Sequence, residues 1–343
     1  MNSPFFSICI AAYNVGGSFD DCLRSIASQD CRDYEVIVVD DGSAVPVEIG
    51  RRIAESIPSV RVERIINSGP YAARQRAFDV ARGEVIVCVD SDDMLLDSAM
   101  LSKLKMGFVQ HDADIVLYNA TSTKRYRDKF LDLSTLGDGG SVEVDAVWDL
   151  YTKGYSLNSL WCKAFKRTLY TKGDKKRPRL LMAEDRLQSL EIMGCARSYW
   201  LIDEPLYFYR PNPASTTNAG YIPDYFAQAC YVEEEVVAFM EGHGMPLGGW
   251  ARYFLSYTSS ALLGMRYNRS LNFKARRCSY ASARSEHIVE LASEHCGAGS
   301  LPKVDALRLR LLLDNSYAAL DASMLPWRIG SAIKRLVRRG SKG

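Results

Sequence analysis

Three carboxylates lie close together at the end of an apolar run, in the sequence VDSDD over residues 89–93. The run itself, EVIVCV, is typical of a buried central strand. Carboxylates this close repel one another, and a cation among them removes the repulsion. Their hard oxygen atoms favour Mg²⁺ or Mn²⁺ over zinc. The pattern therefore predicts a divalent-cation site among Asp90, Asp92 and Asp93, although the residues alone also allow an acidic loop in solvent.

A second pair of acids follows another apolar run, in VDDGS over residues 39–43. Gly42 permits a tight backbone turn at this point. A carboxylate such as Asp41 can accept a hydrogen bond from the N–H of uracil or a similar base. Tyr13, which follows the first apolar run, offers a ring on which a base stacks. These residues predict a nucleobase site, although DDGS on its own is also a common turn.

The elements that must position these side chains are β-branched runs that alternate with helix-period segments, a pattern typical of parallel strands joined by crossover helices. Helices are expected after an N-cap at Ser18 and over Tyr71–Arg82, with Gly83 as the stop. We expect an α/β fold with a mostly parallel central sheet flanked by helices, and ligands at the carboxyl ends of its strands. The predicted strands are Phe6–Ala12, Glu35–Asp40, Val60–Ile66, Glu84–Asp90 and Asp114–Asn119.

The sequence changes character along the chain. Residues 122–145 are polar and Gly-rich, which indicates a loop or a weak hairpin, and helices are expected near Val144–Lys153 and from Glu184. We predict an α/β domain over residues 1–220, with halves at 1–120 and 121–220, and a helical region over 221–343. The predicted helical stretches of that region are Tyr225–Glu241, Trp250–Tyr267, Phe273–Cys296 and Val304–Leu320.

The composition is that of a globular protein with a sizeable core, with 47% hydrophobic and 24% charged residues among 343. It excludes intrinsic disorder and a collagen-like repeat.

Nine scattered cysteines without a CxxC pair fit reduced thiols better than a zinc site or a disulfide framework. No apolar stretch reaches the roughly 18 residues of a membrane-spanning helix, and no basic leader precedes the first apolar run. A cytoplasmic location is therefore expected.

The charge is unevenly distributed, because residues 1–100 hold 9 Lys/Arg and 16 Asp/Glu whereas residues 327–343 hold only basic charges. In this tail Ile329, Ile333 and Leu336 recur at helical spacing opposite the basic side chains, a pattern suited to an anionic membrane surface. We expect residues 327–342 to attach the protein peripherally to the inner face of the cell membrane; the alternative is a terminal helix packed on the helical region. Nucleic-acid binding is not expected, since stacking aromatic residues do not interleave the cluster.

Over residues 5–216 the chain resembles the inverting nucleotide-sugar glycosyltransferases of family 2. The resemblance implies a GT-A fold with a C-terminal helical extension, a nucleotide-sugar-binding half over residues 1–120 and an acceptor-side half over 121–220. It also implies transfer of a sugar, with a UDP-hexose as the expected donor, to an acceptor hydroxyl. The implied acceptor is a lipid-linked saccharide in exopolysaccharide, capsule or lipopolysaccharide biosynthesis. The matching segments are SICIAAYN, CLRSIASQ, VIVVDDGS, INSGPYAARQRAFDVARGEVIVCVDSDD, AEDRL and YFYRPNPAST.

The resemblance further implies a role for each matching residue. Asp92 and Asp90, in the Asp-X-Asp pattern, would hold Mn²⁺ or Mg²⁺ at the diphosphate. Asp185 of AEDRL would be the catalytic base that accepts the proton of the acceptor hydroxyl. Gln75 departs from the family, which usually has Asn after the arginine. The implied nucleotide-sugar-binding residues are Ala11, Tyr13, Asp41, Arg74, Asp90, Ser91 and Arg210.

Other interpretations stay open at the level of the residues. Glu184 and Asp185 also suit a helix N-terminus, and Arg210 also suits a structural role in a loop with two prolines. A sugar-phosphate nucleotidyltransferase would need a basic, Gly-rich loop after the first strand, whereas AAYNVGG has no basic residue before Arg24. A non-catalytic nucleotide-sugar-binding assembly protein is disfavoured because the acidic triplet and AEDRL are both present.

Overall fold

The chain forms two compact units, Met1–Asn212 and Pro213–Gly343. The structure is a computed structural model and describes residues 3–123, 129–171, 177–211, 223–297 and 299–324. The sequence places a boundary near residue 220, which lies outside the described residues, as do residues 327–342 of the basic tail. Each unit is therefore described by itself.

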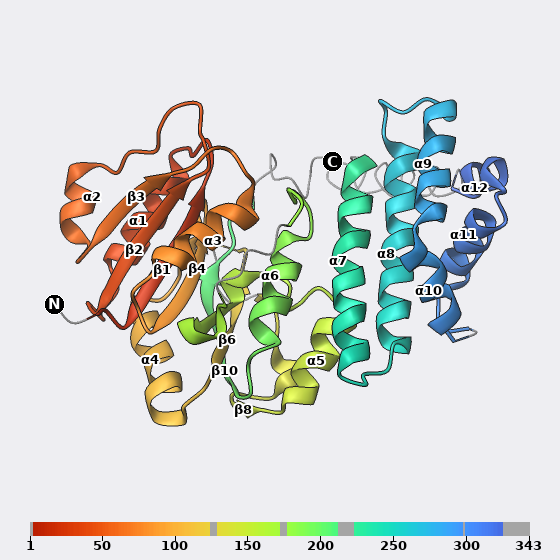
Figure 1. The fold of residues 1–343 in the computed structure, drawn as a ribbon. Helices are drawn as coiled ribbons and strands as arrows, with labels where there is room; N and C mark the ends of the chain where they lie inside the picture. Colours follow the sequence, from red (N-terminus) through yellow and green to blue (C-terminus); the bar gives the residue numbers. More distant parts are fainter. Residues whose placement is uncertain (1–2, 124–128, 172–176, 212–222, 298, 325–343) are drawn as a thin grey trace, which may run out of the picture. The chain divides into compact units, whose positions relative to one another are not determined.

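The first unit is built on a sheet with the strand order β3-β2-β1-β4-β9-β6-β10-β5, in which β7 pairs with β6 and β8 with β10 (Figure 1). β1 is parallel to β2 and β4, β2 to β3, and β6 to β10. β9 runs antiparallel between β4 and β6. The strands are β1 (Phe6–Ala12), β2 (Tyr34–Asp40), β3 (Val60–Arg64), β4 (Val85–Asp90), β5 (Met94–Leu95), β6 (Ile115–Thr121), β7 (Lys129–Leu131), β8 (Gly140–Val142), β9 (Lys163–Lys166) and β10 (Tyr199–Phe208).

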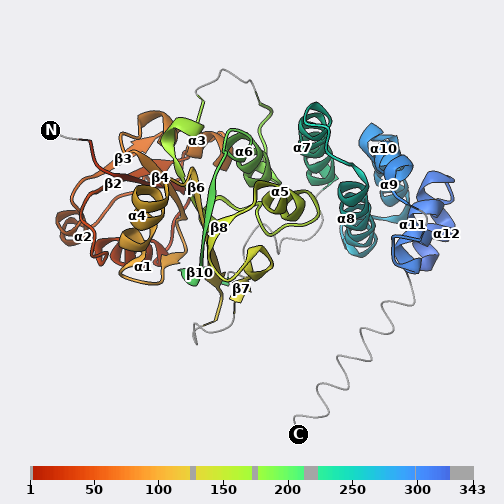
Figure 2. The same ribbon diagram turned by 90° about the horizontal axis from the view of Figure 1, so that it is seen from below.

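Helices cover both faces of this sheet. The central strands are apolar on both sides, and every residue of β2 is buried, because helices exclude water from each face. Figure 2 shows α3 and α6 over one face and α1 and α4 over the other. The helices are α1 (Ser18–Ala27), α2 (Arg51–Ser56), α3 (Pro70–Val80), α4 (Met100–His111), α5 (Val144–Thr152) and α6 (Glu184–Met193), with 3₁₀ turns η1 (Ser134–Leu136), η2 (Leu160–Cys162) and η3 (Arg167–Leu169).

The topology gathers several chain segments at one edge of the sheet. The parallel strands β1, β2, β4, β6 and β10 all end there. The antiparallel strand β9 begins there, so that η2, which precedes β9, lies at the same edge. β5 pairs with the end of β10, through Tyr207 with Leu95 and Phe208 with Met94. The acidic loop between β4 and β5 is thereby held beside the end of β10.

Two local expectations from the sequence are wrong. Ser18 is the first residue of α1 rather than its N-cap, which is Gly17. α3 ends at Val80, so Gly83 does not stop this helix; it allows a close approach to β1, because a Cβ there would lie 2.5 Å from the Ser7 nitrogen. In the described part of residues 122–145, the expected loop contains the short strands β7 and β8, which pair with β6 and β10.

The second unit is helical in its described residues. The stretch expected over Phe273–Cys296 is broken at Glu286, whose backbone is extended. The stretch over Val304–Leu320 is broken near Asn315, which has a φ of 55°. None of the described helices combines the length and hydropathy of a membrane span. The helices are α7 (Pro223–Gly242), α8 (Gly248–Tyr267), α9 (Phe273–Ser285), α10 (His287–His295), α11 (Lys303–Leu313) and α12 (Tyr317–Ser323).

Candidate functional site

The predicted nucleobase residues lie on neighbouring loops at the carboxyl edge. Ala11 is opposite Val39 of β2 and Asp90 of β4 in the strand register. Tyr13 follows β1 and is 56% exposed. Asn14, which the sequence analysis gave no role, has a left-handed φ of 48°, and its side-chain oxygen accepts a hydrogen bond from the backbone N–H of Ala44 at 2.9 Å. Asn14 thus ties the Tyr13 loop to the loop after β2.

Asp41 is fixed by the backbone that leads into α3. Its two carboxylate oxygens accept hydrogen bonds from the N–H groups of Ser68 at 2.7 Å and Gly69 at 2.9 Å. Gly69 has a φ of 93°, a conformation that side-chain-bearing residues rarely adopt. An ionised carboxylate has about four acceptor positions, so two remain for a ligand N–H. Asp41 is only 4% exposed, and its nucleobase role stays a prediction.

The neighbouring acid, Asp40, has a structural environment instead. It is buried, and its carboxylate accepts hydrogen bonds from the backbone N–H groups of Ser43 and Val47. Burial opposes ionisation, but these hydrogen bonds and the charge of Arg64 hold the pKa of Asp40 below its usual value. Asp40 therefore shapes the turn from which Asp41 projects.

The three acids after β4 do not converge, contrary to the simplest expectation from VDSDD. Asp93 is 1% exposed, and its carboxylate accepts hydrogen bonds from the Tyr207 hydroxyl at 2.8 Å and the Arg210 N–H at 2.7 Å. Burial, together with the charge of Asp90, raises the pKa of Asp93 to about 8. The Tyr207 oxygen also accepts a hydrogen bond from the N–H of Asp90 at 3.0 Å. Asp93 thus anchors the acidic loop to β10.

Asp90 and Asp92 remain as candidate metal ligands, with Ser91 between them, and all three are partly exposed. Within the described ranges no three His, Cys, Asp or Glu side chains are grouped so that they could hold a metal ion. Protein sites for Mg²⁺ usually supply only one or two carboxylates, and substrate phosphates and water complete the coordination. This donor set therefore fits Mg²⁺ or Mn²⁺ bound together with a diphosphate rather than by the protein alone.

Arg74 of α3 joins the acidic loop to the start of α6. Its guanidinium lies 3.4 Å from an Asp90 carboxylate oxygen and 3.3 Å from a Glu184 carboxylate oxygen. Burial disfavours the charged form, but the carboxylates of Asp90, Glu184 and Asp185 raise the pKa of Arg74 above its usual value. One buried cation thus brings the predicted metal-binding loop and the predicted base helix together.

Asp185 lies at the start of α6 and is partly exposed. Its carboxylate accepts hydrogen bonds from the Arg186 N–H at 2.8 Å and from the Ser159 hydroxyl at 3.4 Å. Burial, and then the charge of Asp185, raises the pKa of the adjacent Glu184 to about 7. Ala183, just before this pair, has a φ of 61°, a strained conformation for a residue with a Cβ.

Arg210 contacts the acidic loop rather than projecting freely from it. Its Nε donates to the backbone oxygen of Asp92 at 2.8 Å, and one Nη lies 3.2 Å from a carboxylate oxygen of Asp21 in α1. About a third of the side chain is exposed. These contacts support the structural role of Arg210 that the sequence left open beside ligand binding. The exposed part of its side chain faces solvent near the acidic loop.

Sequence reasoning missed Tyr207 and Ser159. Tyr207 bonds to two residues of the acidic loop, and Ser159 bonds to Asp185. The aromatic run YFYRP, which begins in the last two residues of β10, was the available signal for Tyr207. No local pattern distinguishes Ser159, because its partner lies 26 residues away.

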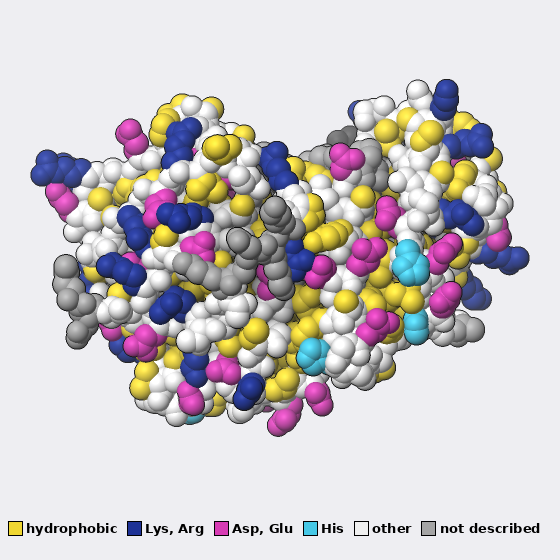
Figure 3. Space-filling model, in the orientation of Figure 1, with side chains coloured by type: hydrophobic (Ala, Val, Ile, Leu, Met, Phe, Trp, Pro, Cys, Tyr) yellow, Lys and Arg dark blue, Asp and Glu magenta, His cyan; other side chains and the backbone are white. Residues whose placement is uncertain are grey.

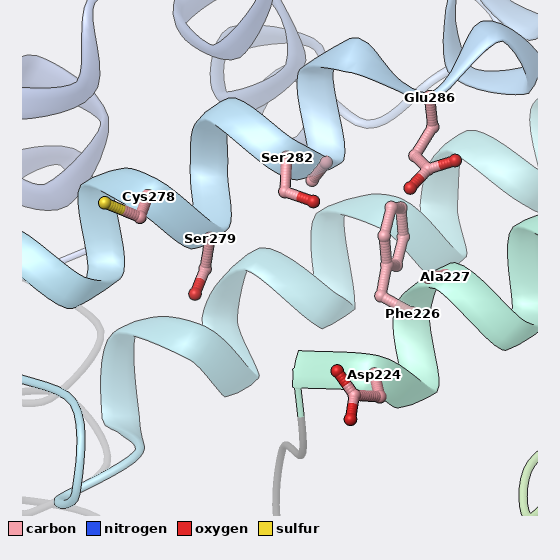
Figure 4. A pocket seen from close by; sticks show the side chains of 8 residues that line it. Asp224, Phe226, Ala227, Cys278, Ser279, Ser282 and Glu286 are labelled. Carbon is pink, nitrogen blue, oxygen red and sulfur yellow. The ribbon is translucent and has the colours of Figure 1, made fainter.

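A pocket of about 270 Å³ in the second unit lies apart from these residues in the sequence (Figure 4). Two carboxylates line it, and burial together with the charge of Glu234 raises the pKa of Glu286. None of the predicted site residues contributes to it. Its lining is Asp224, Phe226 and Ala227 from α7, and Cys278, Ser279, Ser282, Ala283 and Glu286 from α9 and its end.

Comparisons with known proteins agree with this picture. The model of the family described as "Glycosyl transferase family 2" matches residues 7–155. Two curated proteins of Bacillus subtilis (strain 168) are similar: "Uncharacterized glycosyltransferase EpsJ" is 29% identical and "Putative glycosyltransferase EpsH" 26% identical. The matches cover 71% of both chains for EpsJ and 70% for EpsH.

Among solved structures, S. aureus TarS 1-349 in complex with UDP-GlcNAc superposes with a TM-score of 0.69. The two chains are 19% identical, and the match covers 95% of this chain and 92% of the other. A complex of the same protein with UDP gives a TM-score of 0.66. The expected GT-A fold, a mostly parallel sheet flanked by helices with a C-terminal helical extension, is confirmed.

Proposed function

We propose that this chain, whose residues 7–155 match the model of the family described as "Glycosyl transferase family 2", transfers a hexose from a UDP-sugar to a saccharide hydroxyl with inversion of configuration. The structural likeness to a protein solved with UDP-GlcNAc supports a nucleotide-sugar donor. The observation that carries the proposal is the Arg74 guanidinium, which joins Asp90 to the helix of Asp185. The comparisons favour sugar transfer over nucleotidyl transfer.

The donor is held at the carboxyl edge of the sheet. Tyr13 stacks on the uracil ring, and Asp41, held by Ser68 and Gly69, accepts the base N–H. Ala11 and Ser91 line the path from the base to the diphosphate, with Arg74 and Arg210 on its cationic side. Asp92 and Asp90 would hold Mn²⁺ or Mg²⁺, which when bound offsets the negative charge of the leaving UDP.

Asp185 acts as the base. As the acceptor oxygen forms its bond to the anomeric carbon, the Asp185 carboxylate takes the hydroxyl proton, and the bond to the diphosphate oxygen breaks with its electron pair on UDP. The Ser159 hydroxyl orients the carboxylate through its 3.4 Å contact. Such a base contributes about 10²- to 10⁴-fold to the rate.

The acceptor is proposed to be a lipid-linked saccharide of a bacterial surface polysaccharide. The basic residues at 327–342, which lie outside the described residues, would keep the protein at the inner face of the membrane where such acceptors occur. The sugar of the donor is to be identified by Mn²⁺-dependent binding and hydrolysis across a panel of nucleotide sugars.

The substitution Asp185→Asn tests the assignment of the base. The amide keeps the shape of the side chain but cannot accept the proton, so we expect kcat to fall at least about 100-fold. Calorimetry should show binding of UDP with Mn²⁺ that is close to that of the wild type. Asp149→Asn, on the exposed face of α5, is the matched control and should transfer normally. Transfer by Asp185→Asn at the wild-type rate would show that another group is the base.

A further inference from the structure

Four aromatic rings are in series at the carboxyl edge of the sheet, and we call them the aromatic ladder: Tyr207, Trp161, Tyr209 and Phe130. The rings of Tyr207 and Trp161 are stacked, with centroids 4.9 Å apart and planes at 8°. Trp161 and Tyr209 are 5.9 Å apart at 33°. Tyr209 and Phe130 are again stacked, at 4.9 Å and 6°.

The sheet topology explains why these distant residues meet. Tyr207 is in the last two residues of β10 and Tyr209 directly follows the strand, so the two side chains, two positions apart in extended backbone, project to the same side. Phe130 is in β7, which pairs with the end of β6, the strand beside β10. Trp161 is in η2, just before β9 begins at the same edge. The four rings therefore come from three segments, β7, η2 and the end of β10, which the sheet brings to one place.

The inner end of the ladder lies against the proposed chemistry. The Tyr207 hydroxyl donates to Asp93 and accepts from the N–H of Asp90. Trp161 is two residues from Ser159, whose hydroxyl donates to Asp185. The buried inner rings therefore connect the outer end of the ladder to the part of the carboxyl edge that holds the proposed base.

The outer end of the ladder is open to solvent. Tyr207 is fully buried and Trp161 is 8% exposed, whereas Phe130 is 55% exposed. Tyr209, between them, is partly exposed. A large apolar ring held in a parallel stack at the surface leaves a flat apolar face on which a ligand can pack.

We propose that the exposed outer end of the aromatic ladder is the acceptor platform and that it binds an oligosaccharide by one of its pyranose rings. Pyranose rings present flat C–H faces that pack on aromatic rings, and their hydroxyl groups at the ring edge remain free for hydrogen bonds. An inner sugar of the acceptor packs on the uncovered face of Phe130, beside the partly exposed Tyr209, and the terminal sugar points its hydroxyl toward Asp185. This inference rests on the proposed function, because the ladder is assigned to the acceptor by its approach to the proposed base.

An array of bacterial surface glycans tests the platform directly by binding. We expect the wild-type protein, with UDP and Mn²⁺ present, to bind at least one glycan of two or more sugars. Phe130→Ala should weaken that binding about tenfold, because it removes the outer ring. Phe130→Tyr keeps a ring and should bind like the wild type. Phe273→Ala removes another exposed phenylalanine, in the second unit, and should bind normally.

Calorimetry of UDP with Mn²⁺, measured on the same variants, separates this inference from the proposed function. Suppose that UDP binds, but that Phe130→Ala retains full glycan binding or that no glycan binds to the wild type. The proposal of an acceptor platform is then wrong, and the proposed donor site is unaffected. If UDP does not bind but glycans still require Phe130, the platform stands and the donor proposal fails. Normal UDP binding by Phe130→Ala would also show that the variant is folded.

Discussion

At the scale of single residues, the acids near the sheet edge differ in what surrounds them rather than in type. Asp93 is buried against the Tyr207 hydroxyl, with its pKa raised to about 8 by burial and by the charge of Asp90. Asp90 is instead partly exposed and contacts the Arg74 guanidinium. The buried Asp93 therefore has a structural role, whereas the partly exposed Asp90 is available to a ligand, although the two are only three residues apart in the sequence.

The substitution Tyr207→Phe tests the structural role of this hydroxyl while it keeps the ring of the aromatic ladder. Removing the hydroxyl leaves the Asp93 carboxyl and the Asp90 N–H each without one hydrogen-bond partner in a buried place. We expect the free energy of unfolding to fall by about 2 kcal/mol, measured by urea denaturation. The binding of UDP with Mn²⁺ should also weaken, since the acidic loop loses its anchor.

Tyr317→Phe is the control for this change, because the Tyr317 hydroxyl makes an exposed hydrogen bond to Asn315. Its free energy of unfolding should change by less than about 0.5 kcal/mol. Equal stability of Tyr207→Phe and the wild type would mean that the hydroxyl does not anchor the loop.

At the scale of secondary-structure elements, the close packing of β1 against the segment before β4 depends on a residue without a side chain. The N–H of Gly83 donates to the Ser7 hydroxyl at 2.8 Å, and the Ser7 hydroxyl donates to Glu35 at 2.8 Å. A Cβ on Gly83 would lie 2.5 Å from the nitrogen of Ser7 and 2.6 Å from the carbonyl carbon of Phe6. Backbone atoms would have to move, which would displace the strands that carry Tyr13 and Asp90.

We therefore expect Gly83→Ala to lower the free energy of unfolding by about 1–3 kcal/mol, measured by urea denaturation. Gly16→Ala is the matched control, because nothing lies within 4 Å of the added methyl group in the loop after β1. That variant should be as stable as the wild type or slightly more stable. If Gly83→Ala unfolds at the same urea concentration as Gly16→Ala, the close approach is not required.

The sequence predicts the elements with strong local patterns. β1 has the predicted bounds, and the positions of Asp41 and Asp90 after buried strands follow from apolar runs that end in acids. β10 escaped prediction because Asp203, Glu204 and Pro205 interrupt its pattern, and its register against β6 shifts near Pro205. The contacts of Tyr207 with Asp93 and of Arg74 with Glu184 join residues more than 100 positions apart, which no local pattern encodes.

At the scale of the whole molecule, the net charge of −7 over residues 1–100 does not produce an acidic surface on the face seen in Figure 3. Lys, Arg and acidic side chains are interspersed there over the first unit. Several of the acids in this range are buried and hydrogen-bonded, among them Glu35, Asp40, Asp41 and Asp93. Part of the excess negative charge of residues 1–100 therefore lies inside the protein rather than on its surface. The basic residues at 327–342, in contrast, have no acids near them in the sequence.

The basic tail gives a prediction about the whole protein at a membrane. Each basic residue near an anionic surface contributes about 1 kcal/mol, less at high salt, so replacing Lys334, Arg335, Arg338 and Arg339 by Gln removes up to about 4 kcal/mol. We expect the full chain to float with phosphatidylglycerol-containing vesicles and the variant to stay in the dense fraction.

Replacing four exposed basic residues elsewhere, Arg51, Arg52, Lys274 and Arg277, by Gln changes the net charge equally and is the matched control. Because these residues lie outside the amphipathic pattern, that control should still float. Neither protein should float with vesicles of phosphatidylcholine alone, which lack the anionic surface that the basic side chains require. If the tail variant and its control float to the same extent, the tail does not attract the protein to the vesicles. The protein would then have to reach a lipid-linked acceptor without the tail.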